Sequence, residues 1–157
     1  MVSPSKQSKA MILNQLTCPV EYIGKSDTGR VRQVNEDFLG YFNTPNGVVF
    51  VVCDGMGGHN RGDEASRIAV TAICDYLGKE YYEDARQAVY EALSFANFQV
   101  YLRSMESSES RGMGTTCVLA LLRDNQLFYG HIGDSRMYFC KDHTLRQLTK
   151  DHSYVQQ

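Results

Sequence analysis

One segment constrains the fold of this chain more than any other. The residues from Val48 to Cys53 are apolar without exception and lead directly into Asp54. A run without polar alternation predicts a strand that is buried on both faces, so other layers of structure must lie on either side of it. A chain of 157 residues, 43% of them hydrophobic, has enough apolar material for one layered domain of this kind.

The spacing of apolar residues elsewhere predicts a mixture of strands and helices. Strands are predicted over residues 20–24, 38–42, 48–53, 115–122, 127–132 and 136–140. A turn signal over residues 43–47 joins two of them into a hairpin. Helices are predicted over residues 65–76, ending before Gly78, and over residues 85–100, preceded by Asp84. Strands, then helices, then antiparallel strands favour an α+β layered architecture over a parallel βαβ sheet.

The first residues of the chain differ from the rest in composition. Residues 1–17 are rich in Ser, Lys and Gln without a clear period, which predicts a flexible leader before a folded domain over residues 18–157. The longest apolar run of the leader, residues 10–13, is too short for a secretory signal or a membrane span. We therefore expect a cytoplasmic protein.

Composition also excludes several kinds of partner and site. A formal net charge of -2 provides no general field that would attract nucleic acid or an anionic membrane, so any affinity for phosphate must come from a local site. The five cysteines show no C-x-x-C spacing and lie mostly in apolar runs. We expect them to be reduced and buried.

The residues around the end of the apolar run predict a metal site. Asp54 ends the strand, and a glycine-rich turn from Gly55 to His59 follows it. A buried, ionised carboxylate is costly unless a cation or hydrogen-bond donors compensate it, and glycines let backbone carbonyls approach such a cation. Glu36 and Asp37 open the strand that the hairpin pairs with the Asp54 strand. Hairpin geometry would bring these carboxylates together.

The donor types in this cluster indicate which metal it would hold. Oxygen donors without a nearby Cys or His array favour Mg²⁺ or Mn²⁺ over Zn²⁺. A pair of such ions can both activate water and neutralise a phosphoryl group. Arg32, five positions before Asp37, would offer a bidentate fork to phosphate. Taken singly, however, each acidic motif is more often a turn or a solvated strand end.

Five motifs occur together in the order and approximate separation of the type 2C family of protein phosphatases. They are S-D-x-G-x-x-R-x-x-N-E-D from Ser26, D-G-M-G-G-H from Asp54, G-x-G-T-T from Gly112, G-x-x-G-D-S-R from Gly130 and L-T-x-D-H-S from Leu148. The chain resembles this family, in a form similar to its bacterial branch, from about Tyr22 to the last residue.

The resemblance implies a fold, an activity and a set of site residues. The fold would be a four-layer α-β-β-α sandwich of two antiparallel sheets flanked by helices, with two or three Mg²⁺ or Mn²⁺ ions in a cleft at one end. The activity would be hydrolysis of phosphoserine and phosphothreonine in phosphoproteins by a metal-activated water. The implied catalytic residues are Arg32, which would hold the phosphate, Asp37 and Asp54, and the implied metal ligands are Glu36, Asp37, Asp54, Gly55 and Asp134.

Two departures from the family pattern affect these expectations. Met56 stands where animal members carry a histidine proposed as general acid, and His59, His131, His143 and His152 are weak candidates to replace it. The late S-D-G and D-N motifs, which supply two further metal aspartates, are absent from this chain. We therefore expect an incomplete sandwich whose exposed apolar sheet surface promotes self-association.

Two other functions remain open. A chain without the late ligands would serve as a catalytically silent module that binds phosphate or a partner. The segment from Cys140 to Arg146 also matches the bare C-x5-R spacing of phosphatases with a thiolate nucleophile. Such a loop needs glycines and a following helix, whereas this segment is typical of a hairpin turn.

Overall fold

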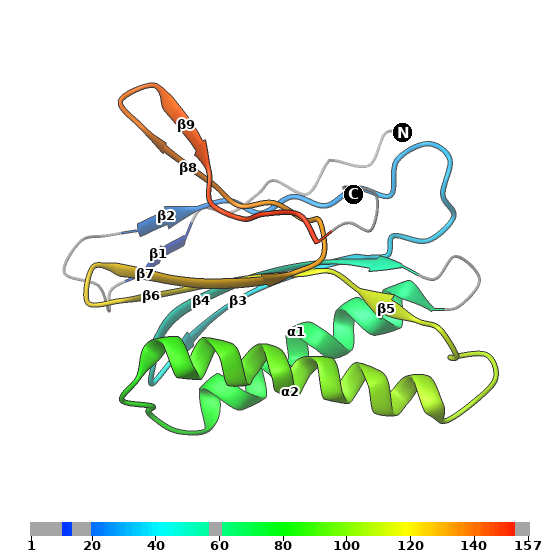
Figure 1. Ribbon diagram of the computed structural model, residues 1–157. Coiled ribbons are helices and arrows are strands. Elements are labelled where there is room, and N and C mark those ends of the chain that lie inside the picture. The colour runs from blue at the N-terminus through cyan, green and yellow to red at the C-terminus, as the bar shows by residue number, and fades with distance from the viewer. Residues whose placement is uncertain (1–10, 14–19, 57–60, 153–157) are drawn as a thin grey trace.

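The computed structural model describes residues 11–13, 20–56 and 61–152. In these residues antiparallel strands form a five-stranded sheet and two two-stranded sheets, and two helices cover one face of the larger sheet (Figure 1). The strands are β1 (Met11–Leu13), β2 (Val20–Tyr22), β3 (Asp37–Thr44), β4 (Gly47–Met56), β5 (Gly114–Thr115), β6 (Cys117–Arg123), β7 (Gln126–Ile132), β8 (Tyr138–Lys141) and β9 (Thr144–Gln147). The helices are α1 (Gly62–Lys79) and α2 (Ala85–Met105). No helix in the described ranges is long and apolar enough to cross a membrane.

Strand β4 lies at the centre of the larger sheet, between β3 and β6. Alternate residues point to opposite faces of a sheet, so Val49, Val51 and Cys53 face the helices and are buried in the core beneath them. The other face carries Phe50 and Val52. Burial of the whole run on both faces was expected, but Val52 is 52% exposed. The ring of Tyr22 in β2 covers this face only as far as Phe50, with 5.3 Å between ring centroids.

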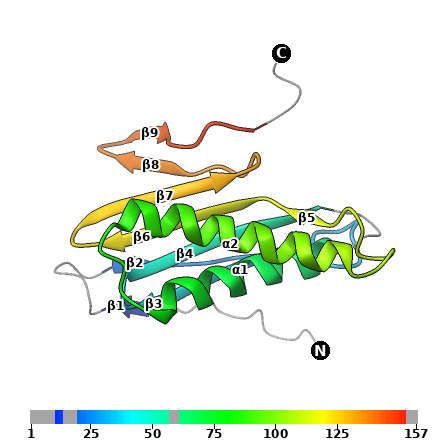
Figure 2. The same ribbon diagram turned by 60° about the horizontal axis from the view of Figure 1, so that its bottom comes forward.

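The described residues form three of the expected layers. Helices α1 and α2 lie side by side across one face of the sheet (Figure 2), while the β1–β2 and β8–β9 pairs lie on the other side of it (Figure 1). The prediction of an α+β architecture built from antiparallel sheets and helices is confirmed. Part of the predicted leader, Met11–Leu13, pairs with β2, and the rest of residues 1–17 lies outside the described residues.

Several element boundaries differ from those predicted. Helix α1 continues through Gly78 to Lys79 instead of ending before the glycine. The strand predicted over residues 115–122 is divided at Thr116, whose amide donates to the Asp54 carbonyl at 2.9 Å. Cys53 and Cys117 are buried as predicted, but Cys74 is only partly buried. Cys140 is exposed, because β8 and β9 pair only with each other among the described strands. Cys18 lies outside the described residues.

Asn46, in the β3–β4 turn, fixes the end of α1 against the hairpin. Its side chain is fully buried, and its amide nitrogen donates to the carbonyls of Leu77 and Glu80 at 2.7 and 2.8 Å. Its side-chain oxygen accepts from the amide of Tyr82 at 2.7 Å. One polar side chain thus satisfies three backbone groups around the C-terminus of the helix.

We expect Asn46→Ala to lower the free energy of unfolding by about 2 kcal/mol, because buried backbone groups lose their partners. Urea denaturation measures this change. Asn43→Ala is the matched control, since Asn43 lies in the same turn region but is exposed, and its substitution should change little. Equal effects of the two substitutions would contradict the capping role of Asn46.

Candidate metal centre

Strand register brings the two candidate aspartates together. Asp37 lies directly opposite Asp54 in the β3–β4 pair, so both side chains project from the same face of the sheet. That face is the one turned away from the helices. Burial raises the pKa of Asp54 above its usual value, and the neighbouring Asp37 carboxylate raises it further. Two carboxylates in this arrangement form a site that favours a bound cation.

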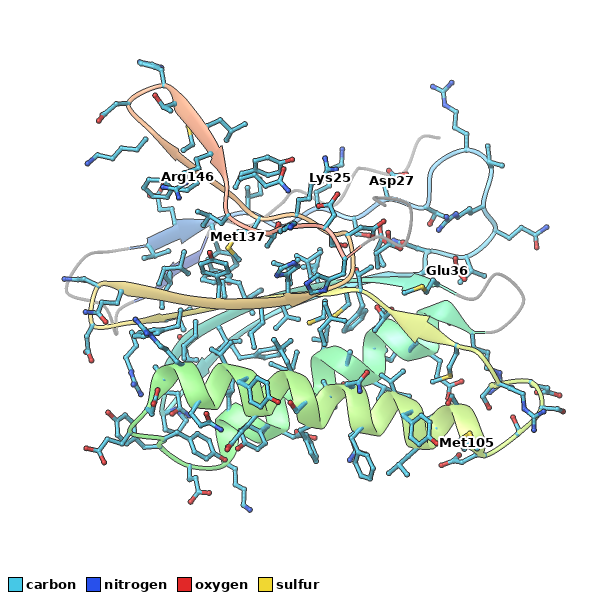
Figure 3. All side chains as sticks on the ribbon, in the orientation of Figure 1. Lys25, Asp27, Glu36, Met105, Met137 and Arg146 are labelled. Atoms are coloured by element: carbon cyan, nitrogen blue, oxygen red, sulfur yellow. The ribbon has the colours of Figure 1, made fainter. Side chains whose placement is uncertain are left out.

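A cleft of about 630 Å³ opens beside Asp54. It is lined by Arg32, Gln33, Val34, Glu36, Asp54, Gly55, Met56, Thr116 and Asp134. Glu36, which just precedes β3, lies at the same end of the sheet as β5 (Figure 3). The structure therefore brings five of the six predicted site residues to one cleft, and the sixth, Asp37, lies beside Asp54 at its edge.

Glu36 connects the backbone of the cleft to its arginine. The Glu36 carbonyl accepts from the Gly55 amide at 3.0 Å, and its carboxylate accepts from the Arg32 guanidinium at 3.2 Å. The Glu36 side chain is only 14% exposed, whereas that of Arg32 is 63% exposed. Asn35 completes the loop, because its side chain accepts from the Asp37 amide at 3.1 Å and donates to Ser26 at 2.6 Å. These hydrogen bonds hold Asn35, Glu36 and Asp37 in place beside the Asp54 strand.

Gly55 occupies a position that no larger residue fits. A Cβ atom there would lie 2.0 Å from the Gly62 carbonyl oxygen and 2.7 Å from that of Glu36. Because both neighbours are backbone atoms, neither can move aside by a change of rotamer. The close approach places the beginning of α1 against the strand that carries Asp54.

The G-T-T and G-D-S-R motifs meet on the other side of Asp54. The Thr116 hydroxyl accepts from the Asp54 amide at 3.1 Å and lies 2.6 Å from the Ser135 hydroxyl. Gly133 adopts a φ of 95°, in the region that favours glycine, and a Cβ atom there would lie 2.8 Å from the Thr116 side chain. This packing places Asp134 in the cleft, where its charge also raises the pKa of Asp54.

Sequence reasoning did not assign a role to Thr116 or to Asp151. Asp151 of the D-H-S motif accepts from the Arg136 guanidinium through both of its oxygens, at distances from 2.6 to 3.1 Å. It therefore anchors the end of the described chain to the loop that carries Asp134. Thr116 belongs to the G-x-G-T-T motif and Asp151 to the L-T-x-D-H-S motif, and this membership is the only sequence feature that points to them.

The donor set fits part of a divalent-metal site. Asp37, Asp54 and the Gly55 carbonyl are oxygen donors, and hard divalent cations take six or more such ligands. Within residues 11–13, 20–56 and 61–152, no group of three or more His, Cys, Asp or Glu side chains is placed to hold a metal. Burial raises the pKa of Asp54, the Asp37 and Asp134 carboxylates raise it further, and the Arg32 guanidinium only partly offsets this shift. Water or further segments would have to complete the coordination.

Without metal, the raised pKa of Asp54 predicts how its replacement affects stability. The fold favours the neutral carboxyl, so ionisation of Asp54 costs stability as the pH rises through its folded pKa. We expect Asp54→Asn to be more stable than the parent at pH 7 in a chelator, and this difference to shrink as the pH falls toward 3.8, the usual pKa of the group. Urea denaturation at several pH values tests this, and a less stable variant at pH 7 would refute it.

Among the described residues, the alternative catalytic groups do not line the cleft. His131 contacts the Lys150 carbonyl at 2.7 Å and stacks on His152, while His143 lies in the β8–β9 turn, and none of these histidines lines the cleft. His59 lies outside the described residues. Cys140 pairs with Leu145 across the β8–β9 hairpin. The hypothesis of a thiolate phosphatase loop is therefore wrong, because this segment is a strand pair and not an anion-binding loop before a helix.

Comparison with known proteins gives consistent matches. The sequence profile of protein phosphatase 2C matches residues 24–157. The serine/threonine phosphatase stp of Listeria monocytogenes serotype 4b (strain F2365) is 38% identical over 136 residues, which cover 83% of this chain and 54% of the relative. The serine/threonine protein phosphatase PstP of Mycobacterium tuberculosis (strain ATCC 25618 / H37Rv) is 34% identical over 142 residues, covering 90% of this chain and 27% of PstP.

Solved structures with a similar fold include a bacterial serine phosphatase, with a TM-score of 0.76 and 33% identity, covering 95% of this chain and 57% of that one. The catalytic domain of PstP in complex with two manganese ions gives a TM-score of 0.73 and 34% identity, covering 83% of this chain and 55% of that one. The chain thus spans about half the length of the Listeria relative and of these solved chains.

Proposed function

The chain belongs to the protein phosphatase 2C family, and on that premise we propose that it contributes to metal-dependent hydrolysis of phosphoserine and phosphothreonine in proteins. It matches the N-terminal portion of the family's catalytic domain. The observation that carries the proposal is the pairing of Asp37 with Asp54 at the edge of a cleft that also contains Arg32. Paired carboxylates beside a guanidinium suit a metal-assisted reaction at a phosphoryl group.

The proposed cofactors are two Mg²⁺ or Mn²⁺ ions, with a third bound more weakly. Asp54, Asp37 and the Gly55 carbonyl would hold the pair, Glu36 would assist directly or through water, and Asp134 would help to hold the third. Bound there, the ions would supply an activated water and neutralise charge on the phosphoryl group. The PstP structure with two manganese ions and the oxygen-only donor set of this cleft both support this choice.

Arg32 is the proposed phosphate-binding residue. Its contact with Glu36 fixes one edge of the guanidinium, while most of the side chain remains exposed to the cleft. The remaining N–H groups suit bidentate binding of phosphate oxygens. Thr116 would act indirectly, since its hydrogen bond to the Asp54 amide holds the strand that presents the carboxylate.

The proposed substrates are phosphoproteins in the cytoplasm, without a nucleic-acid or membrane partner. A net charge of -2 supports this choice, because it provides no general attraction for anionic polymers or surfaces. Selection of a substrate would then depend on side chains around the cleft.

A silent binding module is the second candidate function. It is favoured by the lack, within the described ranges, of any group of three or more side chains placed to hold a metal. Isothermal titration with Mn²⁺, combined with hydrolysis of a phosphopeptide, separates the two. Release of phosphate that depends on Mn²⁺ and stops on addition of a chelator supports the enzyme. Binding of Mn²⁺ and phosphopeptide without hydrolysis supports the module.

We also propose that the sheet face opposite the helices promotes self-association of this chain. Val52, Leu127 and Tyr129 on that face are each at least 40% exposed. Such a face normally packs against another layer, and an uncovered one favours association. Light scattering across a dilution series tests this, and a compact monomer at all concentrations would contradict it.

A further inference from the structure

Helix α2 has apolar residues on both its inner and its outer side. Its inner positions, which include Ala92, Ala96 and Val100, are buried in the core. No residue between Glu91 and Arg103 is charged, so the outer side of this stretch is uncharged as well. A surface helix ordinarily carries charged or polar residues there, and a helix that is apolar all round is normally buried.

Helix α1 shows what an ordinary surface helix of this protein looks like. Its exposed positions include Arg67, Thr71 and Asp75, which are charged or polar. Both helices cover the same face of the sheet, and no described element passes over the outer side of α2 (Figure 2). The apolar outer side is therefore a property of α2 and not of the whole helix layer.

Five of the exposed residues of α2 form one row along the helix. At 100° per residue, the following positions share the side opposite the core: Tyr90, Ser94, Phe98, Tyr101 and Met105. The four large side chains of the row are between 52% and 67% exposed. Met105 lies at the end of the row, on the side of α2 away from the five-stranded sheet (Figure 3).

The row is complementary to itself when it is reversed. Four of its residues, Tyr90, Ser94, Tyr101 and Met105, are spaced symmetrically about the point between Asn97 and Phe98. In an antiparallel pair of α2 helices centred there, Tyr101 of each copy faces the small Ser94 of the other, and Tyr90 faces Met105. Tyr101 thus meets a small residue and Tyr90 a flexible one, and both contacts occur twice, as a two-fold interface requires. The two Phe98 rings meet each other beside the axis. A parallel pair would instead place Tyr101 against Tyr101.

We propose that α2 forms an antiparallel, two-fold interface between two copies of this chain. The exposed parts of the four large side chains of the row amount to on the order of 500 Å² per copy, because each such side chain offers roughly 150–250 Å² and somewhat more than half of it is exposed. A pair would then bury on the order of 1,000 Å², which is typical of a weak, transient interface. None of the five row residues is charged, so contacts between the two rows pair no charged side chains.

Site-directed disulfide cross-linking tests this interface directly. In the 157-residue chain with Cys18→Ser and Cys140→Ser, Asn97→Cys places a thiol beside the proposed two-fold axis. Mild oxidation should convert most of this variant to a cross-linked dimer. Gln87→Cys is the matched control, since Gln87 is also an exposed amide on this side of α2, but its two copies would be about 30 Å apart in the antiparallel pair. It should not cross-link.

A second variant of the cross-linking experiment adds Tyr101→Glu to the Asn97→Cys chain. It places a charge at a contact that occurs twice, so the dimer should dissociate about tenfold more readily or worse, and cross-linking should fall accordingly. Circular dichroism checks that this exposed position leaves the fold unchanged. None of these readouts depends on phosphatase activity or on bound metal.

The cross-linking results distinguish the α2 interface from other ways in which two copies could associate. Cross-linking at Asn97 but not at Gln87, with loss on Tyr101→Glu, supports the α2 interface. Equal cross-linking at both positions indicates a parallel pair and overturns it. No cross-link at Asn97 overturns it too, including the case in which light scattering still detects association, since the copies would then meet through another surface such as the exposed sheet face.

Discussion

In a complete version of the protein with the proposed function, Asp54→Asn should abolish metal-dependent release of phosphate while the protein remains folded. Asp54 lies opposite Asp37, and its own amide and carbonyl are fixed by Thr116. Asparagine keeps the size of the side chain and these backbone contacts, but it removes the charge that would bind the metal pair. Bound ions would supply several kcal/mol of transition-state stabilisation, so phosphate release should fall on the order of a thousandfold or more.

Two measurements test the role of Asp54 separately from folding. Isothermal titration with Mn²⁺ should show greatly weakened binding, and a phosphopeptide assay should show the loss of turnover. Asp124→Asn is the matched control, because it makes the same charge change in the β6–β7 turn, where φ is 52° and asparagine is well tolerated. Activity retained by Asp54→Asn would reject this aspartate as the metal-binding centre.

The outline of this site could be predicted because it depends on local signals. An unbroken apolar run predicts a central strand, a turn signal predicts its hairpin partner, and the two together place Asp37 near Asp54. The observed register places them directly opposite each other. The order of strands and helices was likewise sufficient for the layered α+β architecture.

Contacts between distant parts of the chain could not be predicted in the same way. Asn46 has the composition of a turn residue, yet its main contacts are with the end of α1 and with Tyr82. Thr116 lies within an apparently continuous strand, but its hydrogen bonds to Asp54 divide that strand into β5 and β6. Both roles depend on which distant segments pack together, and local sequence patterns do not reveal that.

The outer side of α2 illustrates a different difficulty. The predicted helix was recognised from the apolar positions that face the core. Tyr90 and Tyr101 lie on the opposite side, and their exposure becomes evident only when the core side has been located. A helix with apolar residues on both sides shows little separation of apolar from polar residues around its axis, so the apolar spacing does not indicate which side faces the core.

Gly55→Ala should damage both the site and the fold, because the added methyl group would lie 2.0 Å from the Gly62 carbonyl oxygen. Relief requires the beginning of α1 to move away from β4, since no side chain can give way. Insertions of this kind typically cost 1–3 kcal/mol and occasionally more, and a backbone clash belongs at the upper end, about 3 kcal/mol. Displacement of the Gly55 carbonyl would also lower turnover on the order of a hundredfold.

Gly114→Ala separates this steric effect from a general intolerance of alanine in the paired strands. Gly114 pairs with Met56, the residue after Gly55, but a Cβ atom there would lie an ordinary 3.6 Å from the flexible Met56 side chain. We expect Gly114→Ala to leave the urea midpoint and Mn²⁺ binding nearly unchanged while Gly55→Ala reduces both. If the two substitutions had equal effects, the close approach of α1 to β4 would not be what holds the Gly55 carbonyl beside Asp54.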